Sequence, residues 1–228
     1  MAIGNPFWAY PIAIVGDNSI ASQVSPLVAA IREAPQRPIR IITHEDESGR
    51  VFNCSFFDDE ETMNGFLDWY STNALASDGP YHHCLQGAAA DKGGLPTRET
   101  LVFGSGSSML ADTRFGEYQL GMAVRYCLWK CKSPEMREEA IARAASLEPR
   151  IAALMEQKGI SYFGRLILTD TVEAGGSGTI LSAVRYGSLE DARQGTAASR
   201  AMLAPEVARW FEPNAPTIIG TAQRVLEV

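Results

Sequence analysis

His44 is one of three histidines in the sequence, and it is the one with a suitable partner near by. It stands near the end of a predicted strand, and a polar hairpin at residues 45–49 leads back into a strand that carries Asn53. Residues equally distant from a short turn face each other, so one register places Asn53 beside His44. A neutral histidine can accept a proton, and an amide can donate to the resulting anion. The pair predicts a catalytic base and an oxyanion donor for a phenol or enol; the alternative is a solvated histidine at a strand end.

Two arginines on predicted strands are the next candidates. Arg125 shares one side of a central strand with Cys127 and Trp129, and Arg165 lies on a neighbouring strand. An arginine among apolar residues is costly unless it is paired or faces a cavity. Arg125 is therefore predicted as a third catalytic residue and Arg165 as a substrate-binding residue, holding a carboxylate, enolate or quinone oxygen. The alternative for both is an ion pair with an acid such as Glu117, Asp170 or a helix carboxylate.

The remaining predicted substrate-binding residues are aromatic or lie in a loop. Trp8, Tyr10 and Trp129 could form stacking walls, although most such residues are simply core. His83 belongs to a long segment, residues 76–98, that reads as a loop lid over a cavity. No residue at a suitable zinc spacing completes a metal site with the His82–His83 pair, and no nucleotide-binding fingerprint is present. The sequence therefore predicts no metal and no cofactor.

Strands and helices that must position these residues follow one order twice. The pattern of apolar residues, Gly and Pro predicts β-α-β-β-α-β, a linker, and β-α-β-β-α-β. The predicted strands cover residues 7–15, 38–44, 50–57, 99–103, 117–132, 160–171, 179–186 and 217–228. The predicted helices cover 19–34, a segment after residue 58, 134–158 and a segment after Ser188, while residues 104–116 read as loop.

This order predicts an α+β fold of two ferredoxin-like units, residues 1–110 and residues 111–228. Each unit has an antiparallel sheet with two helices on one face. One such unit leaves the other face of its sheet bare, and two units can bury both bare faces by packing them together. The expectation is therefore two tandem units with their sheets face to face.

The last part of the chain resembles the dimeric α/β-barrel superfamily, and within it the antibiotic-biosynthesis monooxygenase group. The resemblance rests on the strand and turn at residues 179–189, the acid-started helix at 190–195 and the closing strand at 218–225. It implies an enzyme of secondary metabolism that oxygenates an aromatic or polycyclic, polyketide-like substrate without a cofactor. The resemblance leaves two alternatives open: a cyclase or isomerase acting in the same cavity, and a non-catalytic ligand-binding barrel.

Composition limits the partners of this chain. The 228 residues carry a net charge of −7 with no basic cluster, which argues against nucleic acid and against a membrane surface. No apolar run approaches the roughly 20 residues of a membrane span. The four cysteines form no CxxC pair and are expected as reduced thiols in a cytoplasmic protein. The expected partner is a small aromatic substrate, and a homodimer is left open.

Overall fold

The computed structural model describes residues 7–9, 12–13, 29, 31–47, 51–57, 59–69, 72–73, 105–106, 108–109, 119–168, 179–213 and 217–227. Its strands are β1 (Phe7–Ala9), β2 (Ile12–Ala13), β3 (Arg40–Asp46), β4 (Val51–Phe57), β5 (Ser105–Gly106), β6 (Ser108–Met109), β7 (Ala123–Lys130), β8 (Tyr162–Leu168), β9 (Thr179–Tyr186) and β10 (Thr217–Glu227). Its helices are α2 (Glu60–Trp69), α4 (Pro134–Gln157) and α5 (Leu189–Trp210). The strand predicted at 99–103, and the loop 76–98 with its proposed lid, lie outside the described residues.

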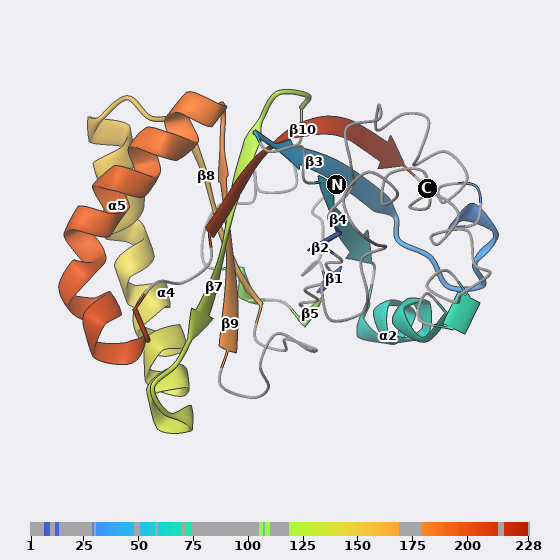
Figure 1. Ribbon diagram of the computed structural model, residues 1–228, viewed down its shortest axis with the longest axis horizontal. Helices are drawn as coiled ribbons and strands as arrows, with labels where there is room; N and C mark the ends of the chain where they lie inside the picture. Colours follow the sequence, from blue (N-terminus) through green and yellow to red (C-terminus); the bar gives the residue numbers. More distant parts are fainter. Residues whose placement is uncertain are drawn as a thin grey trace, which may run out of the picture.

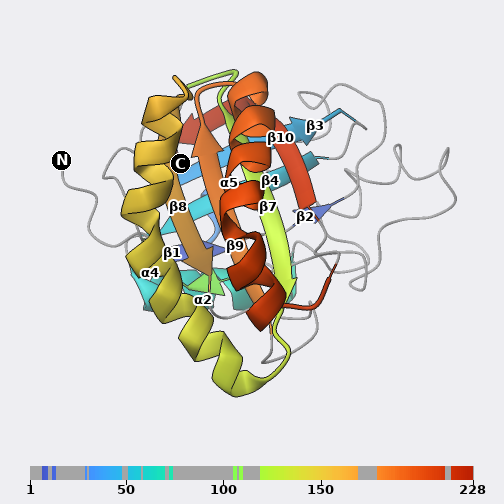
Figure 2. The same cartoon turned by 90° about the vertical axis from the view of Figure 1, so that its left-hand side faces the viewer.

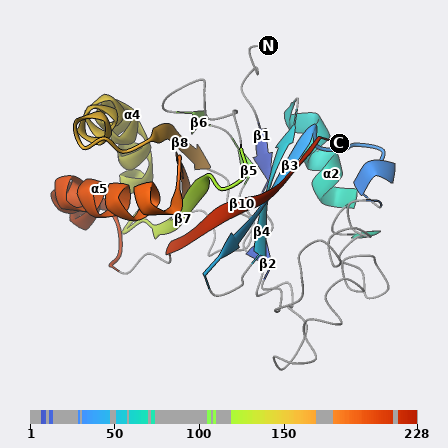
Figure 3. The same cartoon turned by 90° about the horizontal axis from the view of Figure 1, so that it is seen from above.

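The described strands form one antiparallel sheet. Their order is β5-β1-β4-β3-β10-β7-β9-β8-β6, and β2 also pairs with β4. In the second half, α4 connects β7 to β8 and α5 connects β9 to β10, so the order β10-β7-β9-β8 agrees with a ferredoxin-like fold. Seven residue pairs between β3 and β10 join the two halves, and Figure 3 shows β10 running between them. The predicted α+β class with an antiparallel sheet is confirmed.

Local signals set the ends of the two long helices. Ser133 caps α4, with its side chain accepting from the backbone N–H of Met136, and Pro134 opens the first turn. Gly159, at φ 68°, follows the helix, as predicted, because glycine adopts this left-handed conformation without strain. Ser188 likewise caps α5 by accepting from the N–H of Asp191 at 3.1 Å. In the described part of the chain, no helix has the length and apolar character that crossing a membrane requires.

Two of the predicted segments were wrong: one strand is shorter than predicted, and one predicted loop contains two short strands. The strand predicted at residues 117–132 begins only at Ala123, after a turn at Gly121. The predicted loop 104–116 contains β5 and β6, which pair with β1 and β8 respectively. These short segments are rich in Gly and Ser and carry little strand propensity of their own. Their backbone groups are ordered by pairing with strands that are distant in sequence, which local composition does not reveal.

Helices α4 and α5 lie side by side against one face of β7, β8 and β9 (Figures 1 and 2). We call this the helix-facing side of the sheet, and the opposite side its inner face. On the helix-facing side Leu147, Ile151 and Met155 of α4 pack with Val184 and Tyr186 of β9. Helix α5 also packs closely on β9. Gly195 of α5 allows this, because a Cβ at position 195 would lie 2.4 Å from Cε1 of Tyr186.

A β-bulge interrupts β8. Tyr162 pairs with Tyr186 and Arg165 pairs with Val184, so β8 has one more residue than β9 over this stretch. Gly164, at φ 104°, lies in the bulge. The extra residue reverses the alternation of side chains along β8. As a result, Tyr162 and Arg165 project to the same, helix-facing side although they are three residues apart.

Candidate functional site

A cavity of about 580 Å³ lies between α5 and the helix-facing side of the sheet. Strands β7, β8 and β10 supply Arg125, Cys127, Trp129, Arg165 and Thr217 to its lining. The segment after α5 supplies Phe211, Glu212 and Pro213, and helix α5 itself supplies Ser199, Arg200, Leu203, Ala204, Val207 and Ala208. The cavity thus has a sheet wall that carries buried polar groups and a helix wall that is largely apolar.

The sheet wall is the side of β7 that the sequence predicts. Arg125, Cys127 and Trp129 alternate along the strand and all three line the cavity, which confirms that they share one side. The Cys127 thiol lies 3.1 Å from the hydroxyl of Thr217 on the neighbouring strand. The rings of Trp129 and Phe211 lie 5.0 Å apart and form an aromatic corner. A planar aromatic ligand could stack against this corner.

Arg125 is the most informative residue of the cavity. Only 5% of it is exposed, and within the described part of the chain no acid forms an ion pair with it. Its Nε is buried and has no hydrogen-bond partner there. A cation buried without a partner is costly, so its retention in a cavity wall indicates a ligand that supplies the missing negative charge.

Arg165 differs from Arg125 because it has a partner. Its Nε donates to Glu148 of α4 at 3.1 Å and its Nη1 donates to Ser182 of β9 at 3.1 Å. The Tyr162 hydroxyl donates to the other carboxylate oxygen of Glu148. This helix acid is the ion-pair alternative that the sequence leaves open for Arg165. Its Nη2 nevertheless stays buried with no hydrogen-bond partner among the described residues.

Burial and charge both act on the pKa values of this cluster. Desolvation raises the pKa of the Tyr162 phenol well above its ordinary value, and the neighbouring Glu148 carboxylate adds to that rise although Arg165 opposes it. Desolvation alone would lower the pKa of Arg165, but Tyr162 and Glu148 outweigh it and the net shift is upward. Tyr162 is therefore a neutral donor at neutral pH, and Arg165 stays a cation.

Counting charges in the buried wall gives the charge of the expected ligand. Arg125 and Arg165 contribute two positive charges and Glu148 contributes one negative charge, which leaves one positive charge uncompensated. The exposed residues Lys132 and Arg200 add positive charge at the rim, where Glu212 is already paired with Lys130 at 3.0 Å. The cavity is therefore suited to a monoanion with an aromatic body.

His44 lies on the other side of the sheet. It is fully buried, so the predicted alternative of a solvated strand end was wrong. Its ring contacts Tyr126 edge to face, with the centroids 6.1 Å apart. Because Tyr126 follows Arg125 on β7, it projects to the inner face, and His44 does so with it. The structure therefore does not bring His44 together with the two arginines.

The predicted pairing of His44 with Asn53 was also wrong. Strands β3 and β4 pair His44 with Phe52 and Asn53 with Thr43. Successive positions of a strand belong to opposite faces, so positions 44 and 53 are not on the same side of the hairpin. The observed register differs by one position from the register that would pair His44 with Asn53. The hairpin therefore gives no geometric basis for a catalytic base beside an oxyanion donor.

The other predicted residues are spread over the chain. Trp8 stands on β1, where its backbone pairs with Phe56 and Gly106, far along the sheet from β7. Tyr10 and His83 lie outside the described residues. Of the eight predicted site residues, Arg125, Trp129 and Arg165 line one cavity. Within the described ranges, no group of three or more His, Cys, Asp or Glu is placed to hold a metal ion.

Sequence reasoning missed Glu148, Tyr162, Ser182 and Phe211. Glu148 carried a signal that could have been used, because it stands between the apolar residues Leu147 and Ile151 on the buried stripe of its helix. A carboxylate at such a position usually has a cationic partner. For Tyr162 and Ser182 no local signal exists, since they reach Arg165 and Glu148 only through the bulge and the pairing of β8 with β9.

No family model matches the sequence, and no curated protein matches it significantly. Solved structures match over nearly the whole chain. An anthrone oxidase-like protein gives a TM-score of 0.62 at 10% identity, covering 99% of this chain and 95% of the other. A protein from Fusobacterium nucleatum that is named as a monooxygenase gives 0.57 at 9% identity, covering 98% and 95%. A chlorite dismutase variant from Candidatus Nitrospira defluvii gives 0.54 at 11% identity, covering 96% and 92%.

At these identities the likeness concerns the fold alone. It supports the predicted ferredoxin-like α/β class over the full length of the chain. Membership of the antibiotic-biosynthesis monooxygenase group stays a prediction. What the chain does must be argued from its own cavity.

Proposed function

We propose that this protein is an oxygenase that acts on a planar aromatic substrate in its phenolate or enolate form. The observation that carries the proposal is Arg125, a buried cation that faces the main cavity and has no partner among the described residues. An enolate is a monoanion that shares its charge between one oxygen and a carbon, and a guanidinium can donate hydrogen bonds to that oxygen. The structural neighbours named as an anthrone oxidase-like protein and a monooxygenase agree with this reaction class.

Each residue has a specific role in the proposed reaction. Arg125 binds the substrate oxygen and, because it favours the anion over the neutral form, makes the substrate more acidic. The free Nη2 of Arg165 is a second donor towards the same oxygen, and the ring of Trp129 supports the aromatic body. Water at the open mouth of the cavity accepts the proton, so this mechanism requires no histidine on the helix-facing side.

The enolate itself supplies the electrons that reduce oxygen, so no metal or flavin is required. For anthrone, the enolate carbon forms a bond to O₂, and protonation gives a hydroperoxide. The O–O bond then breaks as the remaining hydrogen on that carbon leaves as a proton. One anthrone and one O₂ give one anthraquinone and one water.

Oxygen consumption with anthrone tests the proposal. The wild type should consume one O₂ for each anthraquinone formed, at a rate above the spontaneous oxidation of anthrone. Arg125→Met should lower the rate by about 10²–10³-fold, the usual effect of removing a donor to a developing oxyanion. The matched control is Arg150→Met, which removes an exposed arginine from α4 and should leave the rate unchanged. Equal rates in the wild type and in Arg125→Met would refute the role of Arg125, and turnover without oxygen consumption would favour the cyclase or isomerase.

We further propose that the two halves, residues 1–110 and 111–228, are tandem ferredoxin-like units whose sheets enclose a common interior. Two observations support this. In the first half the order β5-β1-β4-β3 repeats the order β10-β7-β9-β8 of the second, and the two ends of the sheet, β5 and β6, are separated by one residue. A crystal structure that places residues 105–109 away from β1 or from β8 would refute the closure.

A further inference from the structure

A second, smaller cavity of about 70 Å³ lies between α4, α5 and the sheet. We call it the side pocket. Six of the residues that line only this pocket are apolar, and Ser182, Glu206 and Trp210 complete that set: the apolar ones are Ala140, Ala144, Leu147, Ile151, Ile167 and Ile180. Most of these side chains are buried in the two core clusters under α4. The apolar side chains under α4 give this part of the pocket a surface that an apolar group fits better than water does.

The side pocket adjoins the main cavity. Trp129, Arg165, Leu203, Val207 and Phe211 line both spaces, so these five residues form their common boundary. Arg165 is part of that boundary, which places the polar end of the main cavity directly beside the apolar space. A ligand whose oxygen is held by the arginines therefore has an apolar recess within reach.

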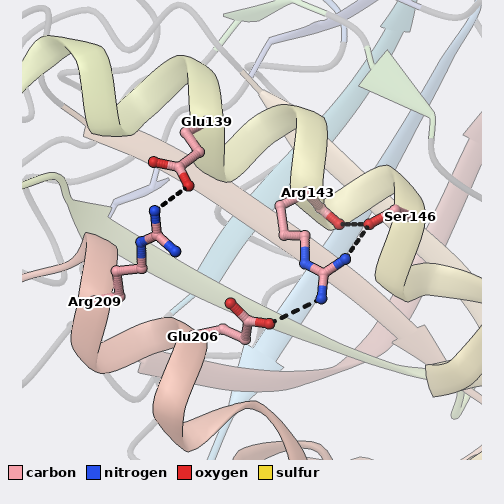
Figure 4. Close-up of polar contacts among 5 residues, drawn as sticks. All are labelled: Glu139, Arg143, Ser146, Glu206 and Arg209. Atoms are coloured by element: carbon pink, nitrogen blue, oxygen red, sulfur yellow. Dashed lines mark hydrogen bonds and ion pairs between the residues drawn. The ribbon is translucent and has the colours of Figure 1, made fainter.

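Helices α4 and α5 are tied together over this recess. Arg143 of α4 pairs with Glu206 of α5 at 3.1 Å, and Arg209 of α5 pairs with Glu139 of α4 at 2.6 Å (Figure 4). Glu206 itself lines the side pocket. Arg143 also donates to the hydroxyl of Ser146 on its own helix, which fixes the direction of its side chain. The two ion pairs therefore link α4 to α5 beside the side pocket.

We propose that the side pocket receives a short alkyl substituent of the aromatic monoanion in the main cavity. The inference rests on the anion site of the proposed function but not on oxygen chemistry. It defines the substrate class as an alkyl-substituted aromatic monoanion, with its charged oxygen at the arginines, its ring at Trp129 and its substituent between α4 and α5. Because the space is small, about 70 Å³, the pocket distinguishes short substituents from long ones.

Binding of 2-naphthoate, an unreactive planar monoanion, and of its 5-alkyl and 6-alkyl derivatives tests the inference by isothermal titration calorimetry. In one of the two series, affinity should rise about fourfold for each methylene that is buried. The gain should end after the first few carbons, when the pocket is full. Ala144→Leu fills the side pocket and should abolish this gain without weakening the binding of unsubstituted 2-naphthoate. Ala142→Leu, an exposed position on the same helix, is the matched control and should behave as the wild type.

A second variant tests the same space from the opposite direction. Ile151→Val removes one methyl group from the lining and should move the preferred substituent towards a longer chain, which keeps the inference testable if Ala144→Leu does not fold. If neither series gains affinity in the wild type, or if the gain survives in Ala144→Leu, the side pocket is not the substituent site. Failure of 2-naphthoate itself to bind would instead refute the anion site. Absence of oxygen consumption would leave the binding results intact and refute only the reaction.

Discussion

Replacing Arg125 with methionine should make the ligand-free protein more stable while it weakens anion binding. Only 5% of Arg125 is exposed, its Nε is buried, and its guanidinium forms no ion pair with any described residue. Methionine has a similar length and no charge, so it can fill the same space beside Cys127 and Trp129. An enzyme that holds an uncompensated charge for its substrate gives up stability to do so.

The size of each effect follows from the environment of the side chain. Replacing a buried ion pair with apolar residues can stabilise a protein by about 1–4 kcal/mol, and for the single charge of Arg125 we expect the lower part of that range. For a chain of this length, a gain of about 1–2 kcal/mol raises the Tm by roughly 2–8 °C. Loss of charge-assisted hydrogen bonds worth about 1.5–3 kcal/mol should weaken 2-naphthoate binding by roughly 10–150-fold.

Thermal unfolding followed by circular dichroism, with and without saturating 2-naphthoate, measures both effects in one experiment. Without ligand the Tm of Arg125→Met should exceed that of the wild type. Ligand should raise the Tm of the wild type but have little effect on the variant, because stabilisation by a ligand depends on its affinity for the folded state. Arg150→Met should match the wild type in both conditions. A lower Tm for ligand-free Arg125→Met would mean that Arg125 has a structural partner, and the reasoning would be refuted.

Three further predictions concern the parts of the fold that place the site. Gly164→Ala should lower the free energy of unfolding by about 1–3 kcal/mol and weaken 2-naphthoate binding, because its φ of 104° is strained for alanine and the bulge positions Arg165. Gly121→Ala, at φ 84° with open space around the added Cβ, is the matched control that should lose stability but keep binding in urea unfolding and calorimetry. Burial raises the pKa of Tyr186, so the folded protein keeps this proton to higher pH than the unfolded chain. The free energy of unfolding should therefore fall as pH rises above about 10, and Tyr186→Phe should reduce that fall when unfolding is measured between about pH 9 and 11.5. His44→Gln should consume oxygen with anthrone as the wild type does, and a folded but inactive His44→Gln protein would place the chemistry on the inner face instead.

Features that depend only on neighbouring residues could be predicted before the fold was known. Ser133 and Ser188 mark the starts of α4 and α5, and Gly159 follows the end of α4, because caps act within one helical turn. The shared side of Arg125 and Trp129 on β7 also followed from the sequence, since side chains alternate along any regular strand. These local rules were sufficient to place Arg125, Cys127 and Trp129 on one side of β7 and to predict the α+β class.

Contacts between side chains that are distant in the sequence depend on the folded structure. Hairpin geometry allowed more than one register for β3 and β4, and the register that forms pairs His44 with Phe52 because the core selects the face on which each residue is buried. The bulge at Gly164 reverses the alternation of side chains along β8 and turns Arg165 towards Glu148, a residue 17 positions earlier. No local sequence pattern predicts this reversal. Burial without compensation, the property that identifies Arg125, depends on every element packed around it. Burial and pairing of Arg125 depend on residues that are distant in the sequence, so local sequence patterns do not predict them.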